Sequence, residues 1–324
     1  MRSPFSTVGT VLATALLACG CTHSSSGGGG FLAATATNGT TTAPVASATP
    51  APVASSTPMP TYGTRKCWPI VFVHGMAGFK NIGPLDYWMN VPQTLQANGF
   101  ETFVVVDSPF ATIADRATQA MAQIVAKYPD PRVKVNLIGH SMGGLDCRYM
   151  VSSLGFADRV ATVTTVGTPH HGSSVADVII GLIPGFVSAP LNAAMQALLG
   201  WDLLHQGQEL TTVFADQTFN PNNPDDPRVS YFSWTGTADP LGLGGDSIIE
   251  LALDPTWMVL DNLEGPNDGL VSVKSGTWGQ FLGTVPADHL SEVGQPFGIT
   301  PSSYDYQSYF LDWALKLEAM GFGP

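Results

Sequence analysis

The sequence predicts an α/β fold, in which a mostly parallel β-sheet carries helices on both faces. Short apolar runs typical of buried strands alternate along the chain with segments whose apolar residues repeat at helical spacing. This alternation begins only after about residue 63, and residues 64–324 are enough for one domain. These residues contain no internal repeat.

The expected strands and helices follow one another in turn. Strands are expected at residues 68–74, 101–106, 159–167 and 229–234 and directly before residue 139, and helices at residues 87–97 and 113–128. The second helix has apolar residues at helical spacing, namely Ile113, Ala117, Ala120 and Ile124. Parallel sheets bind ligands at the carboxyl ends of their strands, where we place His74, Ser141 and Gly167.

The N-terminus predicts export. Arg2 precedes an apolar run at residues 7–18, which is too short to span a bilayer and is typical of a secretory signal peptide. The signal peptide is expected to cover residues 1–18. The following Cys19 and Cys21 each come after a small residue and resemble the lipobox of bacterial lipoproteins, so either cysteine is a candidate for lipidation. The alternative is a plain signal peptide with incidental cysteines.

Residues 22–63 predict a tether between this anchor and the domain at residues 64–324. They are mostly Ser, Gly, Ala, Thr and Pro without any charged residue, a composition that cannot bury a core. The whole chain has a formal net charge of −12, and its Lys and Arg residues are scattered, which argues against nucleic-acid binding. Cys67 opens a strand and Cys147 follows on a helix, so we expect two buried thiols.

The central motif is a G-x-S-x-G sequence at residues 139–143. An apolar strand runs into it and a helical segment leaves it, which is the context of a nucleophilic serine at a tight strand-to-helix turn. Gly139 and Gly143 meet the need for small neighbours on both sides of Ser141. The alternative is an ordinary glycine-rich loop in which Ser141 caps the helix.

A serine nucleophile also requires an oxyanion hole, a base and an acid. The backbone N–H groups of Met142 and of Met76, in the loop after the first strand, are the expected oxyanion donors, although a simple turn is the alternative for the second. His289 is the candidate base, because it alone among seven histidines lies late enough in the chain. Asp268 and Asp239 both remain as candidate acids.

Several motifs together resemble the bacterial true lipases, which are exported triacylglycerol lipases with the α/β-hydrolase fold. The matching segments are residues 69–79, 86–88, 136–144, 165–173, 267–272 and 289–290. The resemblance implies Ser141 as nucleophile, Asp268 rather than Asp239 as acid and His289 as base. It also implies Met76 and Met142 as oxyanion donors.

Two departures from this family concern calcium and the N-terminus. Such lipases hold a structural calcium with one aspartate upstream of the acid and another two residues after the histidine. Asp254 matches the first position, but Ser291 occupies the second, which puts the calcium site in doubt. We expect no cofactor for the chemistry itself. Because of the predicted anchor, a need for the lipase-specific foldase stays open.

Residues 174–205 are expected to form a lid. They are mainly apolar or small, and Gly181, Pro184 and Pro190 interrupt them, so they cannot form one transmembrane helix. The resemblance implies an inserted apolar helical lid over Ser141, and a fixed cap is the alternative.

The sequence therefore predicts an exported serine hydrolase, anchored by lipid to the cell envelope, that cleaves carboxylic esters and most of all acylglycerols. Its partners would be a lipid or ester substrate and a membrane surface, the outer membrane if the source has one. The alternatives are a polyester depolymerase, a short-chain carboxylesterase and a catalytically silent surface binding protein.

Overall fold

The computed structural model describes residues 58–76, 78, 81–82, 85–181, 207–238, 250–295, 300–301 and 303–324. The predicted signal peptide, most of the tether and most of the predicted lid lie outside these residues. None of the described helices is both long and apolar enough to cross a membrane.

The central sheet has six strands, all parallel, in the order β4-β1-β5-β6-β7-β8. Its strands are β1 (Ile70–Val73), β4 (Thr102–Val104), β5 (Val135–His140), β6 (Val160–Val166), β7 (Ser230–Gly236) and β8 (Gln280–Val285). The short strands β2 (Asn81–Ile82) and β3 (Leu85–Asp86) form a separate antiparallel pair. The predicted parallel sheet is confirmed, and β8 is an additional strand that the sequence analysis did not identify.

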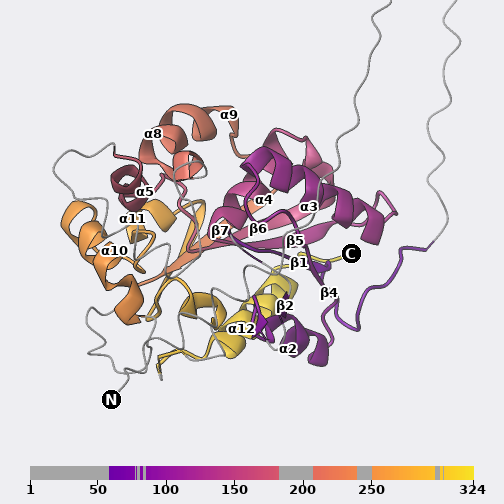
Figure 1. Ribbon diagram of the computed structural model, residues 1–324. Helices are drawn as coiled ribbons and strands as arrows, with labels where there is room; N and C mark the ends of the chain where they lie inside the picture. Colours follow the sequence, from indigo (N-terminus) through magenta and orange to yellow (C-terminus); the bar gives the residue numbers. More distant parts are fainter. Residues whose placement is uncertain are drawn as a thin grey trace, which may run out of the picture.

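Helices cover both faces of this sheet (Figure 1). The helices within the described residues are α2 (Val91–Ala97), α3 (Ile113–Lys127), α4 (Met142–Ser152), α5 (Ser174–Ile179), α8 (Thr212–Phe214), α9 (Asn220–Asn222), α10 (Glu250–Leu263), α11 (Val273–Gly276) and α12 (Tyr306–Ala319). A π-helical turn spans Ala215–Phe219, and 3-10 turns span Phe156–Arg159, Gly207–Leu210 and Ser291–Val293. Helices α3 and α4 lie on one face of the sheet, and α2 and α12 lie on the other.

The two cores follow from the alternation of side chains along β1. Ile70 and Phe72 pack in the core under α2 and α12, whereas Val71 and Val73 pack in the core under α3 and α4. All four side chains are fully buried, as is expected for a central parallel strand with helices on both sides.

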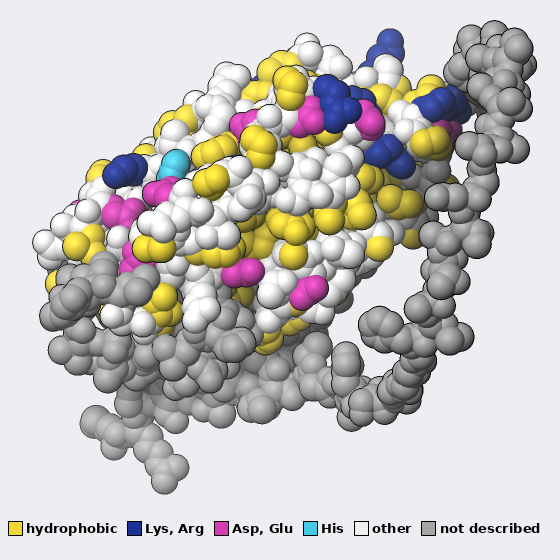
Figure 2. Space-filling model, turned by 90° about the horizontal axis from the view of Figure 1, so that it is seen from above, with side chains coloured by type: hydrophobic (Ala, Val, Ile, Leu, Met, Phe, Trp, Pro, Cys, Tyr) yellow, Lys and Arg dark blue, Asp and Glu magenta, His cyan; other side chains and the backbone are white. Residues whose placement is uncertain are grey.

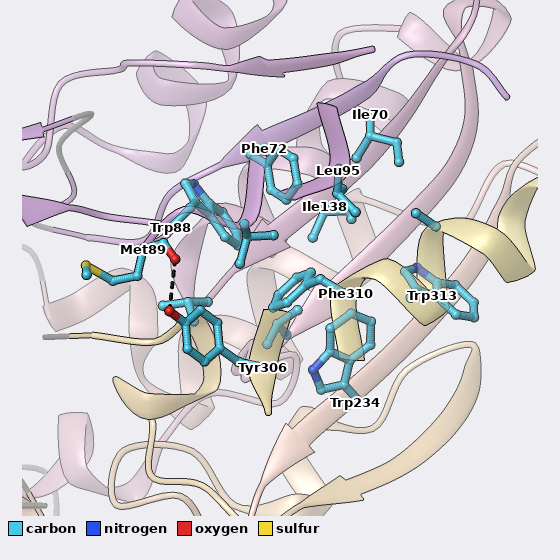
Figure 3. Close-up of a cluster of buried hydrophobic side chains, with 14 of the residues drawn as sticks. Ile70, Phe72, Trp88, Met89, Leu95, Ile138, Trp234, Tyr306, Phe310 and Trp313 are labelled. Atoms are coloured by element: carbon cyan, nitrogen blue, oxygen red, sulfur yellow. Dashed lines mark hydrogen bonds between the residues drawn. The ribbon is translucent and has the colours of Figure 1, made fainter. Parts of the chain in front are cut away.

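Helix α12 completes the first of these cores (Figure 3). The ring of Phe310 lies 6.0 Å from that of Trp88 and 5.4 Å from that of Trp234. The Tyr306 hydroxyl donates a hydrogen bond to the Met89 carbonyl, 3.0 Å away. Through these contacts α12 packs directly against β7 and against the turn that precedes α2.

The expected helix at residues 87–97 is shorter than predicted. It begins at Val91, because Met89 and Asn90 have positive φ angles of 34° and 66° and Asp86 accepts a hydrogen bond from the Trp88 N–H. Tyr87 therefore lies in a turn rather than on a helix, and this position brings it to the site described below. The cysteines Cys67 and Cys147 are free and buried, as predicted.

Charged side chains are sparse on the face of the molecule that Figure 2 shows. Seen from above, the molecule shows mainly hydrophobic and uncharged side chains, with Lys and Arg in small separate groups (Figure 2). This face shows no continuous basic stripe.

Candidate active site

Ser141 sits in a strained turn between β5 and α4. Its backbone has φ 55° and ψ −132°, which few residues other than glycine adopt. Its N–H donates to the Val166 carbonyl over 2.8 Å, and its side chain makes no capping hydrogen bond with α4. The interpretation of Ser141 as a helix-capping serine is therefore wrong, because its hydroxyl does not bind the first N–H groups of α4.

The glycines around Ser141 are required by close packing of the backbone. A Cβ atom on Gly139 would lie 2.6 Å from the Gly143 carbonyl oxygen, and one on Gly143 would overlap the Val73 carbonyl. A Cβ atom on Gly75 would lie only 2.7 Å from the Ser141 Cβ. The loop after β1 therefore rests directly against the serine, where the sequence predicts an oxyanion hole.

Arg116 binds the backbone carbonyl groups of this loop. Its Nη2 donates to the His74 carbonyl over 2.6 Å and to the Gly75 carbonyl over 3.3 Å. Two buried carboxylates bind the same guanidinium, Asp107 at 2.8 Å and Asp146 at 2.9 Å. With its carbonyl groups held by Arg116, the peptide that leads into Met76 is fixed before any substrate arrives. Met142 is the first residue of α4, so its N–H is one of the unpaired donors at a helix start.

His289 and Asp268 form a buried pair. The His289 Nδ1 donates to the Asp268 Oδ2 over 2.8 Å, and the His289 N–H donates to the Asp268 carbonyl over the same distance. The other carboxylate oxygen of Asp268 accepts from the N–H groups of Leu270 and Val271. The turn after α10 and the loop after β8 are thus joined through both backbone and side chains.

His140 links this pair to the serine and to the loop after β1. The Gly75 N–H donates to the Tyr87 hydroxyl over 2.9 Å, and this hydroxyl donates to the His140 Nδ1 over 2.6 Å. The His140 Nε2 then donates to the His289 carbonyl over 2.9 Å. Burial lowers the pKa of His140 well below its ordinary value, and this neutral ring can accept one bond and donate the other.

Ser141 and His289 lie on adjoining segments, because His140 directly precedes the serine and binds the His289 carbonyl. Within the described residues, the Ser141 hydroxyl makes no hydrogen bond with the His289 ring. Catalytic hydrogen bonds are often long without substrate and tighten when it binds.

Glu292 is a buried acid that the sequence analysis missed. Its Oε2 lies 3.3 Å from the His140 Nε2 and 3.9 Å from the His289 Nδ1, and its Oε1 accepts from the Gly236 N–H. Burial, helped by the charge of Asp268, raises the pKa of Glu292 well above its ordinary value. Only its position three residues after His289 could have pointed to it.

The cluster of His140, His289 and Glu292 is not a fitting metal site, although its ligand atoms lie within 4.8 Å of one another. The His140 Nε2 already donates to the His289 carbonyl, and the His289 Nδ1 donates to Asp268. Ring nitrogens that carry protons cannot act as metal ligands.

The other described histidines have different partners. His74 faces Asp107, and burial together with Arg116 lowers its pKa to about 3. His170 is buried and stacks on Trp278, while His171 is exposed and pairs with Asp216. The rival acid Asp239 lies outside the described residues, as does most of the predicted lid. Only the start of the lid, helix α5, is described.

The chain matches known proteins over this domain. Residues 69–200 match the family model of the alpha/beta hydrolase fold. A triacylglycerol lipase of Vibrio cholerae is 32% identical over 266 residues, which cover 73% of this chain and 82% of the relative. Triacylglycerol lipase 2 of Saccharomyces cerevisiae is 30% identical over 223 residues, which cover 66% of this chain and 64% of the relative. The crystal structure of the mature Bacillus licheniformis lipase BlEst2 is 26% identical, with a TM-score of 0.58 over 73% of this chain and 90% of that one.

From the buried cluster of Arg116, Asp107 and Asp146 we predict that the folded protein loses stability at alkaline pH. Burial raises the pKa of Asp107 to about 8 and that of Asp146 to about 7, although Arg116 opposes the rise. A carboxyl group whose pKa is higher in the folded state than its unfolded value of about 4 binds a proton on folding. The resulting stabilisation is complete below pH 4 and is lost as the pH rises through the folded pKa values.

Asp107→Asn cannot titrate and should therefore flatten this pH dependence. Between pH 6 and pH 9 we expect its free energy of unfolding to fall by less than that of the unmodified chain, with a difference on the order of 1 kcal/mol. Urea denaturation at several pH values measures the effect. Asp130→Asn is the control, because Asp130 is on the surface and its pKa is lowered by Arg132. Parallel curves for Asp107→Asn and the unmodified chain would contradict the assignment.

Proposed function

Because the chain belongs to the triacylglycerol lipases of the α/β-hydrolase fold, and is therefore a carboxylic ester hydrolase, we propose that it cleaves acylglycerols through Ser141, His289 and Asp268. The observation that carries this proposal is the buried His289–Asp268 pair, held through His140 beside a serine with a strained backbone.

In the proposed reaction His289 is the general base. Its Nε2 takes the proton of the Ser141 hydroxyl, whose oxygen attacks the ester carbonyl carbon. Asp268 keeps the proton on the His289 Nδ1 and stabilises the imidazolium that forms. The same proton then goes to the leaving alcohol, and a water molecule activated by His289 hydrolyses the acyl-enzyme.

The negative charge on the carbonyl oxygen would be held by the N–H groups of Met76 and Met142. Two contacts support this role: Gly75 touches Ser141, and Arg116 fixes the carbonyl groups of the same loop. Donors that are already in place need no reorganisation during the reaction, which is where an oxyanion hole gains most of its effect.

Replacing triad members should abolish turnover while the fold remains. Ser141→Ala should lower kcat roughly 10⁴-fold or more, because the nucleophile is lost. Asp268→Asn should lower kcat by about 10³–10⁴-fold, because His289 is then held in the wrong tautomer. Hydrolysis of a p-nitrophenyl ester and covalent labelling by a fluorophosphonate measure both effects.

Asp239→Asn is the matched control for Asp268→Asn and should change kcat little. A severe loss in Asp239→Asn with a mild one in Asp268→Asn would reverse the assignment of the acid. Normal turnover in Ser141→Ala, or an unmodified chain that no fluorophosphonate labels, would leave the silent binding protein as the better interpretation.

The apolar surroundings of the site favour substrates with acyl chains. The side chains of Met76 and Met142 belong to an apolar cluster that also contains Val175 and Val178 of α5 and Leu260 of α10. This apolar surface next to the two oxyanion residues would bind the hydrocarbon of a long acyl chain. A short acyl group would bury little apolar surface there and would contribute little binding free energy.

We therefore expect kcat/KM to rise by about tenfold or more from p-nitrophenyl acetate to p-nitrophenyl octanoate, because each buried methylene contributes up to about 0.8 kcal/mol. Tributyrin and trioctanoin emulsions should be hydrolysed as well. A maximum at acetate would favour the short-chain carboxylesterase, and preferential release of monomers from a solid polyester would favour the depolymerase.

For the N-terminus we propose export followed by lipid anchoring at Cys19 or Cys21. The support is the short apolar run before them and the uncharged tether after them, both of which lie mainly outside the described residues. A single acyl chain binds membranes only marginally, whereas several give stable anchoring, and lipoprotein modification adds more than one.

The double variant Cys19→Ser with Cys21→Ser should release the protein from membranes. The unmodified full chain should sediment with membranes and partition into detergent, and the double variant should do neither while it keeps its esterase activity. Each single variant shows which cysteine is modified. Free release of the unmodified protein into the medium would instead indicate an ordinary cleaved signal peptide.

A further inference from the structure

The residue before the proposed base, Asp288, forms a closed turn of its own. Its side chain is fully buried, and its Oδ1 accepts from the N–H groups of Leu290 and Ser291, each over 2.9 Å. Its Oδ2 accepts from the Ser291 hydroxyl over 2.6 Å. The Glu292 N–H donates to the Asp288 carbonyl over 3.0 Å and completes the turn.

Ser291 occupies the place where the related lipases are expected to carry a calcium-binding aspartate, two residues after the histidine. Calcium requires six to eight oxygen ligands, with carboxylates among them. Here the hydroxyl of Ser291 is fully buried and donates to Asp288, and the Asp288 carboxylate is turned into its own loop by three donors. This set of residues does not fit a calcium site.

We propose that Asp288 and Ser291 hold the loop of His289 in place of a metal ion and act as positioning residues for the base. The proposal rests on the proposed role of His289. The loop is fixed at three points: the Asp288–Ser291 turn, the His289 N–H on the Asp268 carbonyl, and the His140 ring on the His289 carbonyl. The first of these lies next to the base and supplies the order that a calcium ion would otherwise provide.

The first test compares the full chain in EGTA and in millimolar calcium chloride. We expect the same midpoint of thermal unfolding to within about one degree and the same kcat to within about twofold. A metal that bound the folded state alone would raise the midpoint by about 5 °C or more at saturating concentration. Such a rise, or heat of calcium binding to the folded domain in a calorimeter, would overturn the proposal.

The second test is Ser291→Ala, which removes the hydroxyl and leaves the buried Asp288 Oδ2 without its donor. We expect kcat to fall about tenfold with little change in KM, and the rate of fluorophosphonate labelling to fall in parallel, because the base is less well placed. Added calcium should not restore either rate. Unchanged kcat and labelling, or recovery in calcium, would refute the positioning role.

Ser308→Ala is the matched control. The Ser308 N–H and hydroxyl bind the carboxylate of Asp305 over 3.1 Å and 2.7 Å, the same arrangement three residues apart, at the start of α12. This variant loses a hydrogen bond of the same geometry at an exposed place outside the catalytic loop, so its kcat should not change. If Ser291→Ala does not fold, the calcium experiment on the unmodified chain still decides the proposal, and its result does not depend on the outcome for Ser141→Ala.

Discussion

The backbone of Ser141 is the constraint on which the site depends. Ser141 has a positive φ angle, and the backbone around it is packed more closely than a Cβ atom at Gly75, Gly139 or Gly143 would permit. The same close packing presses the loop after β1 against the serine. Nucleophile and oxyanion loop are therefore positioned by a single packing arrangement, and a side chain at any of these glycines would disturb both.

The parts of the molecule that were predictable from the sequence are those encoded by neighbouring residues. The strand, the tight turn and the helix around Ser141 lie within twenty residues, and the order of serine, acid and histidine is a property of the chain itself. Strand β8 was missed because its residues are only partly buried and give no clear apolar run. Helix 87–97 was expected too early, since the turn set by Asp86 and the left-handed Asn90 depends on local hydrogen bonds that apolar spacing does not report.

The contacts that hold the site together could not have been read from the chain. Tyr87 and His140 are 53 residues apart, His140 and His289 are 149 apart, and nothing in the spacing shows that they meet. Arg116 would pass as a surface residue of an amphipathic helix, yet it is fully buried. Around the His289–Asp268 pair, burial favours the neutral forms of His140 and Glu292, so polar groups surround the pair without adding competing charge.

The packing of α12 has a consequence for the order of events during biosynthesis. The carbonyl of Phe322, near the end of the chain, accepts hydrogen bonds from Trp68 and Asn136 at the start of β1 and β5, and Phe310 fills the space beside Trp88 and Trp234. The hydrophobic core on this side of the sheet therefore stays open until α12 and Phe322 have been synthesised. Because a helix distant in sequence from β1 closes this core, the domain completes its packing only after most of its residues have been made, which suits the export proposed above.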